Sequence, residues 1–401
     1  MPAPSYDEVV GPVRSRALVA LGGLLVVLAT LLGPGQRVAQ AYPQWQLSTG
    51  AARCNQCHYA PAGGGLINSY GRDQDGELST FGGDGGFLHG SVDLPTWLAL
   101  GGDFRAGFVD QDVQDLNGNT VAVFPMQADL TARIALPLGF SVLGVLGFRD
   151  QVRNPDVLIP EQNFQPVSTS QLVSREHYAM WQPEALGPYL RAGRFYAPYG
   201  LRMAEHILYI NRDLGFDELE ETYNVSGGFI EEHQELHLTL FAPDFVRHIG
   251  SDEKGFAGYL ETRFRDDTIA VAAQTRLALS PGVTKLMGGL VGKVWIEPLR
   301  TLLLGEVDAV NQSFTDLGGV DRTQMVGALG FTLFPVRGVM ITLLGERNQV
   351  DVQVDDAWTA GTLLINWFPY AHCEMQLMER VQFPTGGAAA NTLFFQLHYF
   401  L

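Results

Sequence analysis

The sequence has little charge and almost no lysine. Charged side chains make up 17% of its 401 residues, and only three residues are lysine, whereas a typical globular protein is about 25% charged. Acidic side chains outnumber basic ones by 43 to 26, which gives a formal net charge of −17. Nucleic-acid binding, which needs a basic face, and halophilic adaptation, which adds many charges, are therefore both disfavoured. Disorder is disfavoured too, because 46% of the residues are hydrophobic.

Long apolar runs are also scarce. The one candidate, Ala17–Leu32, follows two arginines and precedes the small-residue triplet Ala39-Gln40-Ala41. Its 16 residues fall short of the about 20 that a membrane-spanning helix needs. A basic start, a short apolar run and a small-residue cleavage site are instead typical of a secretory signal peptide, which we expect at residues 1–41. The mature chain is then exported, and any membrane crossing within it must use strands.

Cysteine is rare, and its placement is the most specific signal in the chain. Two of the three cysteines lie in Cys54-Asn55-Gln56-Cys57-His58, the CxxCH pattern of c-type haem attachment in exported proteins. The spacing lets both thiols reach the vinyl groups on one porphyrin edge, and the adjacent histidine then serves as an axial ligand of the iron. A thioredoxin-like pair, a zinc site and a local disulfide are also conceivable, but they fit less well in a glycine-rich stretch with three local ligands. The motif therefore predicts one covalent haem c on Cys54, Cys57 and His58.

Residues 91–401 alternate between apolar and polar side chains. Around Leu303, for example, the apolar Leu303 and Val307 alternate with Glu306 and Asp308. A period of two with one polar face is typical of a half-buried β-strand. A soluble sandwich would show similar strands, but charges of both signs on the polar faces and aromatic residues near strand ends favour a lipid-facing exterior and a wet lumen. Because lipid tolerates no open sheet edge, the sheet must close.

The predicted fold is therefore all-β, a transmembrane antiparallel β-barrel of about 16 strands in the bacterial outer membrane. The short links 265–267 and 335–338 should be periplasmic turns, and the longer segments 151–171 and 201–221 should be outer loops or inward folds. The chain ends in Leu401, whereas such barrels usually end in an aromatic residue. Strands are expected at 95–109, 120–136, 139–150, 172–182, 188–197, 222–231, 233–243, 255–265, 267–279, 283–296, 300–311, 321–334, 338–349, 356–369, 371–382 and 391–401.

Residues 42–90 form the predicted haem segment. About 50 residues cannot enclose a porphyrin alone, so the segment must borrow its walls from the barrel. The second axial ligand is open. His89 is the nearest downstream histidine, Met126 and Met203 are other early candidates, and an open site or a ligand from the barrel interior is also consistent with the sequence.

Further polar clusters have simpler interpretations. His233, Glu235 and His237 follow one another at every second position and could bind a metal, but a polar lumen face is favoured. Cys373 is expected to face lipid as an inert thiol. Four carboxylates near the haem segment could attract a cation, although solvation of a glycine-rich loop explains them better: Asp73, Asp75, Glu77 and Asp84.

Two stretches carry a family resemblance. Ser48-Thr49-Gly50, the CxxCH motif, Pro61 and Asn68-Ser69-Tyr70-Gly71 together resemble the haem end of the outer-membrane cytochrome–porin fusions of iron-oxidising bacteria. In that family a short monohaem segment precedes a barrel of about 16 strands. Ala192–Gly200 resembles the strand end of phosphate-selective porin-like barrels.

The resemblance implies an electron conduit. A haem in or under the barrel would pass electrons from an extracellular donor, for which the family suggests Fe(II), to a periplasmic carrier such as a soluble cytochrome. The residues leave open whether this amounts to an Fe(II) oxidase activity. A solute porin or transporter with an accessory or sensory haem segment is the main competing interpretation, and a haem peroxidase with an open distal face is a weaker one.

Overall fold

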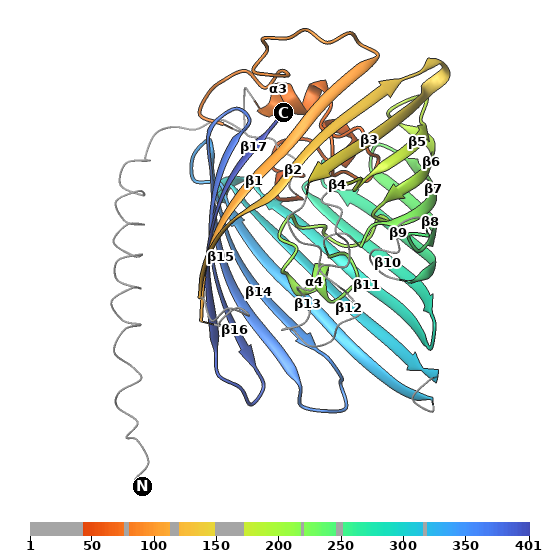
Figure 1. Cartoon of the computed structure of the whole chain (residues 1–401), viewed down its shortest axis with the longest axis vertical. Helices are drawn as coiled ribbons and strands as arrows, with labels where there is room; N and C mark the ends of the chain where they lie inside the picture. Colours follow the sequence, from red (N-terminus) through yellow and green to blue (C-terminus); the bar gives the residue numbers. More distant parts are fainter. Residues whose placement is uncertain are drawn as a thin grey trace, which may run out of the picture. The chain divides into compact units, whose positions relative to one another are not determined.

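Figure 1 shows the computed structural model, which describes residues 43–75, 80–112, 120–148, 172–217, 220–245, 252–315 and 319–401. The chain divides into two units, 1–36 and 37–401, and all described residues belong to the second. The expected signal peptide, the long segment Gln151–Gln171 and the carboxylate of Glu77 lie outside the described residues.

The described residues form one closed antiparallel sheet of seventeen strands, in which β1 pairs with both β2 and β17. β4 and β5 pair with β3 one after the other and together occupy one strand position. The barrel wall is therefore sixteen strands around, as predicted. The strands are β1 (Leu98–Gln111), β2 (Val121–Ala135), β3 (Phe140–Phe148), β4 (Leu172–Val173), β5 (His177–Trp181), β6 (Gly187–Phe195), β7 (Thr222–Ile230), β8 (Gln234–Ala242), β9 (Lys254–Phe264), β10 (Ile269–Ser280), β11 (Val283–Ile296), β12 (Thr301–Phe314), β13 (Val320–Leu333), β14 (Val339–Gln349), β15 (Ala357–Tyr370), β16 (Cys373–Pro384) and β17 (Ala390–Phe400).

The barrel is apolar outside and charged inside. On β12, Glu306 and Asp308 are buried, whereas Val307 between them is 45% exposed. On β8, His237 is buried while Leu236 and Leu238 are exposed. An exterior of exposed leucine, valine and phenylalanine suits lipid, and closure through β1 and β17 removes the sheet edges that lipid would leave unsatisfied. The barrel is therefore a membrane-spanning fold, as its alternation predicted.

Short connections gather at one end of the barrel. Because neighbouring strands are antiparallel, every second link around the barrel lies at the same end. The links 136–139, 265–268 and 297–300 are related in this way and therefore share one end. Most connections at the other end are longer, including 196–221 between β6 and β7 and 350–356 between β14 and β15. The predicted alternation of short and long links is confirmed.

One predicted strand, 172–182, is interrupted. Ser174 and Arg175 leave the ladder between β4 and β5, whereas the carbonyl of Glu176 still accepts a hydrogen bond from the amide of Val145 on β3 at 2.8 Å. The carbonyls of Ser174 and Arg175 instead accept hydrogen bonds from Nη1 of Arg194 on β6, at 2.6 and 3.1 Å. A buried arginine therefore replaces the missing strand pairing.

Two segments fill the lumen. The first is residues 43–75, whose Trp45, Leu47 and Ala52 pack in the core, and the second is the loop 196–221, whose short helix is seen inside the barrel in Figure 1. The helices are η2 (Pro43–Trp45), α2 (Cys54–Cys57), α3 (Ser69–Gln74), η4 (Pro137–Gly139), α4 (Tyr209–Arg212) and η6 (Glu297–Leu299). Within the described residues, no helix has the length and apolar character to cross a membrane.

The hydrophobic core lies inside the lumen, where both segments meet the wall. The ring of Trp45 in η2 lies 5.0 Å from that of Phe334 and 5.9 Å from that of Phe368. Core side chains come from the first segment, from the loop and from the barrel wall: Trp45, Leu47, Leu201, Leu208, Tyr209, Leu302, Leu344 and Phe368. Residues 43–75 thus use the barrel as their wall.

The loop 196–221 is held to the inner wall by carboxylates. The amide of Leu201 donates to Oε2 of Glu306 at 2.8 Å, and the amide of Tyr209 donates to Oε1 of Glu346 at 2.7 Å. The hydroxyl of Tyr199 donates to Oδ1 of Asp308 at 2.6 Å. The inward fold predicted for Leu201–Glu221 is confirmed.

Candidate functional site

The CxxCH motif is a single helical turn inside the barrel. In α2, Cys54 and Cys57 are three residues apart and lie on one face of the turn. The amide of His58 donates to the carbonyl of Cys54 at 3.0 Å, and His58 then leaves the helix in an extended conformation. The turn therefore presents two thiols and an imidazole close together.

The second helix explains why Asn68 and Gly71 accompany the motif. Asn68 Nδ2 donates to the carbonyl of Gln56 at 3.0 Å, and Asn68 Oδ1 accepts from the amide of Gly71 at 2.9 Å. A Cβ at Gly71 would lie 2.5 Å from the carbonyl oxygen of Cys57. Asn68 thus joins α2 to α3, and Gly71 allows their close approach.

The glycine run that follows the motif has a conformational cause. Gly63, Gly64 and Gly65 have φ values of 78°, 80° and 61°, which favour glycine. A Cβ on Gly63 would also lie 3.0 Å from Cβ of Cys54. The run lets the chain turn tightly over the first cysteine.

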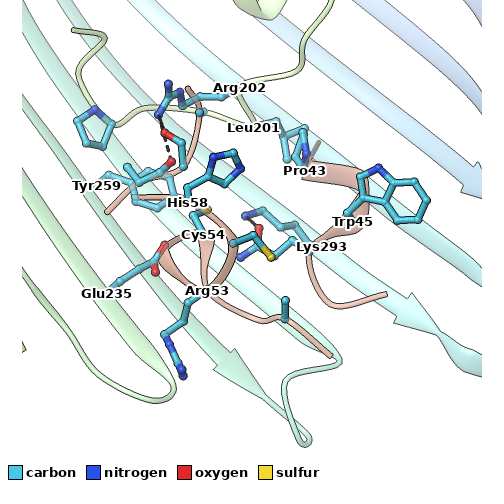
Figure 2. Close-up of a pocket in the computed structure, with 18 of the residues that line it drawn as sticks. Pro43, Trp45, Arg53, Cys54, His58, Leu201, Arg202, Glu235, Tyr259 and Lys293 are labelled. Atoms are coloured by element: carbon cyan, nitrogen blue, oxygen red, sulfur yellow. Dashed lines mark hydrogen bonds between the residues drawn. The ribbon is translucent and has the colours of Figure 1, made fainter. Parts of the chain in front are cut away.

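Cys54, Cys57 and His58 line one cavity of about 120 Å³. Figure 2 shows Arg202, Glu235 and Lys293 around Cys54 and His58. The cavity is lined by the first segment, by the loop and by the barrel wall: Pro43, Trp45, Gln46, Thr49, Ala51, Arg53, Cys54, Cys57, His58, Ala62, Gly63, Gly64, Pro198, Tyr199, Gly200, Leu201, Arg202, Glu235, His237, Tyr259 and Lys293. The motif therefore faces a chamber inside the lumen.

Burial controls the protonation of the motif. It raises the pKa of Cys54 to about 12 and that of Cys57 to about 11, so both remain thiols at neutral pH. Burial, with a contribution from Arg202, lowers the pKa of His58 to about 4, which keeps the imidazole neutral. A thioredoxin-like pair has a lowered thiol pKa, so a redox pair of that kind does not fit.

Neither a disulfide nor a zinc site forms at the motif in the described part of the chain. All three cysteines are free thiols. Among the residues that the structure describes, no three histidine, cysteine, aspartate or glutamate side chains are grouped so as to hold a metal ion.

A buried charge network ties the first segment to the wall beneath the cavity. Nζ of Lys293 lies 2.7 Å from Oε2 of Glu261 and donates to Oε1 of Gln46 at 2.6 Å. Nη1 of Arg263 donates to the other Glu261 oxygen at 2.9 Å. Since buried charges are tolerated when they are paired and hydrogen-bonded, the network fixes Gln46 against β9 and β11.

The residues predicted as second axial ligands lie away from the motif. His89 is beside the β15–β16 turn, where its Nε2 is 3.2 Å from the hydroxyl of Tyr399 and its ring is 4.7 Å from that of His372. Met126 lies on β2 and Met203 in the core of the loop. The described residues that line the cavity include none of the three. Ligation by them stays a prediction.

His237 belongs to the site, although the sequence pattern favoured only a polar lumen position for it. Its side chain is 1% exposed and lines the cavity from β8. Glu235 is also buried, as a polar lumen face predicts, whereas His233 precedes the strand and pairs with Asp267 at 2.9 Å. The sequence indicated only that His237 occupies an inward-facing position of its strand. That this strand faces the haem segment became clear from the structure.

Cys373 agrees with its predicted position, whereas Asp75 does not. Cys373 lies on the outward face of β16, next to the buried Glu374, as expected. The prediction that Asp75 is solvated is wrong. Its side chain is fully buried and accepts a hydrogen bond from the amide of His372 at 3.1 Å. Packing of the segment against the barrel buries this carboxylate.

Neither a family model nor a curated protein matches the chain. Among solved structures, OmpT of the Vibrio cholerae outer membrane is similar with a TM-score of 0.58 and 9% identity, over 78% of this chain and 100% of that one. The anion-selective porin from Comamonas acidovorans is similar with a TM-score of 0.54 and 12% identity, over 76% of this chain and 99% of that one.

The chain folds as a sixteen-stranded porin-like barrel. Such barrels, with an apolar exterior and a closed antiparallel sheet, belong to the bacterial outer membrane. The porin half of the resemblance is confirmed at the level of fold, and so is the predicted location.

Proposed function

We propose that this porin-like barrel is an electron-transfer protein that carries one covalent haem c in its lumen. The observation that supports the proposal best is the position of Cys54, Cys57 and His58, which line a chamber between two inward-folded segments. A CxxCH motif in that place has no role in a solute channel. For a haem site, the barrel supplies the surrounding walls that the short segment is too small to form by itself.

The donor set fits a c-type haem. Two thiols lie on one face of a turn, and the adjacent imidazole is neutral because burial lowers its pKa to about 4. Nδ1 of His58 is buried without a hydrogen-bond partner among the described residues. The chamber, at about 120 Å³, is smaller than the about 300 Å³ of a usual ligand pocket. The long side chain of Arg53, which is only partly buried on its wall, would therefore have to move aside.

The residues around the chamber have distinct tasks in this proposal. When bound, haem supplies a one-electron couple whose potential depends on its axial ligands and surroundings. Cys54 and Cys57 fix it covalently and His58 ligates the iron. Arg202 and Lys293 offer cations to the propionate groups. The closed wall of the barrel excludes lipid and keeps the surroundings of the haem constant.

The charge of the lumen supports a cationic donor. Among the described residues, the inner wall and the loop 196–221 carry more buried carboxyl groups than buried basic groups, including Asp308, Glu346 and Glu374 on the wall. Such a surface attracts cations and repels anions. Fe(II) outside the cell is therefore a suitable donor, and a soluble cytochrome that docks at the short-turn end is a suitable acceptor. Transfer of electrons from Fe(II) to this acceptor would amount to an Fe(II) oxidation.

A solute channel is the second candidate, because one structurally similar protein is an anion-selective porin. Two observations weigh against it. Residues from 43–75 and from 196–217 pack in the lumen, and the excess of buried carboxyl groups on the described inner wall does not suit anions.

Purification from outer membranes followed by a haem stain and a reduced-minus-oxidised spectrum with Fe²⁺ tests the proposal. We expect covalent haem that Fe²⁺ reduces in wild type and in Cys373→Ala, and none in Cys54→Ala/Cys57→Ala. Wild-type protein without covalent haem would overturn the proposal. Swelling of liposomes in small solutes by that same protein would then support the channel.

A further inference from the structure

His237 is held rigidly on the barrel wall of the cavity. It lies on β8, and its Nδ1 is 2.8 Å from the hydroxyl of Tyr189. That hydroxyl is 3.3 Å from Oγ of Ser226, which is itself 2.8 Å from Oγ1 of Thr239. The chain of hydroxyls fixes the plane of the imidazole.

The second ring nitrogen of His237 makes no hydrogen bond within the described residues. This atom, Nε2, is buried, and Oε1 of Glu235 lies 3.8 Å from it. A buried polar atom without a partner destabilises the fold. On the wall of a cofactor chamber, such an imidazole nitrogen is available to bind a metal ion.

We infer that Nε2 of His237 is the second axial ligand of the haem iron, opposite His58. The inference rests on the proposed haem function and extends it from the first segment to the barrel wall. His58 and His237 line the same cavity, whereas His89, Met126 and Met203 do not.

The hydrogen bonds suit this role. A ligating Nε2 must carry no proton, so Nδ1–H has to donate to the oxygen of Tyr189. The Tyr189 hydroxyl can then donate to Ser226, and Ser226 can donate to Thr239. Metal-bound histidines are usually oriented in this way through their second nitrogen. Tyr189 is thus a positioning residue for His237.

A bond to each histidine would join the first segment to the barrel. His58 belongs to residues 43–75, and His237 belongs to the wall. The loaded protein would have a six-coordinate, low-spin iron, and release of the segment from the lumen would require that one axial bond break.

Spectra of the full-length protein with its haem test the inference. Wild type and the matched control His233→Ala should be low-spin and should not bind carbon monoxide after reduction. His237→Ala should be high-spin and should bind carbon monoxide, and added imidazole should restore the low-spin spectrum. Covalent haem content should stay within twofold of wild type in all three, since Cys54 and Cys57 are intact.

A second variant keeps the test decisive if His237→Ala does not fold. His237→Met retains a buried side chain and a sulfur ligand, so it should stay low-spin with a higher reduction potential, as expected for histidine–methionine ligation. An unchanged potential in His237→Met, or a low-spin His237→Ala that excludes carbon monoxide, would overturn the inference. So would a high-spin His89→Ala. Wild type without covalent haem would instead overturn the proposed function itself, which the haem stain reports separately.

Discussion

Arg202 and Ala62 join the two segments that fill the barrel. Nη1 of Arg202, in the loop 196–221, donates to the carbonyl of Ala62 at 3.1 Å and to that of Gly63 at 3.3 Å. Arg202 thus reaches the glycine run that covers Cys54. The loop and the first segment form one plug because of this contact.

Loss of that contact should loosen the plug. Arg202→Ala should lower the free energy of unfolding by about 2 kcal/mol, because hydrogen bonds from a charged group are each worth about 1.5–3 kcal/mol. It should also raise the conductance of single barrels in planar bilayers. The control is Arg347→Ala on β14, where the arginine is exposed. Equal conductance in the two variants would contradict the plug.

The buried pair beneath the cavity should matter more for stability. Lys293→Met leaves Glu261 with one cation, and breaking a buried pair costs about 3–5 kcal/mol. Lys254→Met, at the exposed start of β9, should cost less than about 0.5 kcal/mol. Denaturant unfolding in detergent measures both. A similar stability for the two variants would mean that Lys293 does not anchor the first segment.

Gly71→Ala should separate α2 from α3. The added Cβ would meet the carbonyl oxygen of Cys57 at 2.5 Å, whereas a Cβ on Gly82 would meet nothing within 4 Å. We expect Gly71→Ala to reduce covalent haem per barrel at least threefold and Gly82→Ala to leave it unchanged. The haem stain, normalised to folded protein, measures this. Full haem content in Gly71→Ala would show that the close approach of the helices is dispensable.

The loop 196–221 should become less stable as pH rises. Burial raises the pKa of Glu205 from 4.5 to about 7, with a smaller contribution from Glu374. In the unfolded chain this carboxyl ionises near its ordinary pKa, so its contribution to stability is complete below pH 4.5 and is lost as pH rises through about 7. The loss amounts to roughly 3 kcal/mol.

Glu205→Gln should remove this dependence. Its free energy of unfolding relative to wild type should increase between about pH 5 and pH 8. The control is Glu232→Gln, because Glu232 is exposed in the β7–β8 turn. A constant difference across this range would mean that Glu205 is ionised in the folded protein.

The sequence was sufficient for the wall of the barrel. Strands such as Val283–Ile296 could be predicted to the residue, because lipid outside and a polar lumen inside impose an alternation on each strand. The interruption at Ser174 and Arg175 could not be predicted, since it depends on Arg194 from the next strand.

The candidate site was predictable only in part. Cys54, Cys57 and His58 are contiguous, so their spacing alone defines the motif. His237 is far away in the chain, and its approach to the motif follows from how residues 43–75 enter the lumen. Distance along the sequence favoured His89, but folding carries His89 to Tyr399 and not to the cavity. Asp75 was misjudged for the same reason, because its burial depends on the β15–β16 turn.

Electron transfer across a membrane tests the central claim most directly. Wild-type protein in liposomes that contain a soluble oxidised cytochrome c, with Fe²⁺ added only outside, should reduce the enclosed cytochrome. Liposomes with Cys54→Ala/Cys57→Ala should not. No reduction by haem-loaded wild type, or equal reduction by the variant without the two cysteines, would contradict the account.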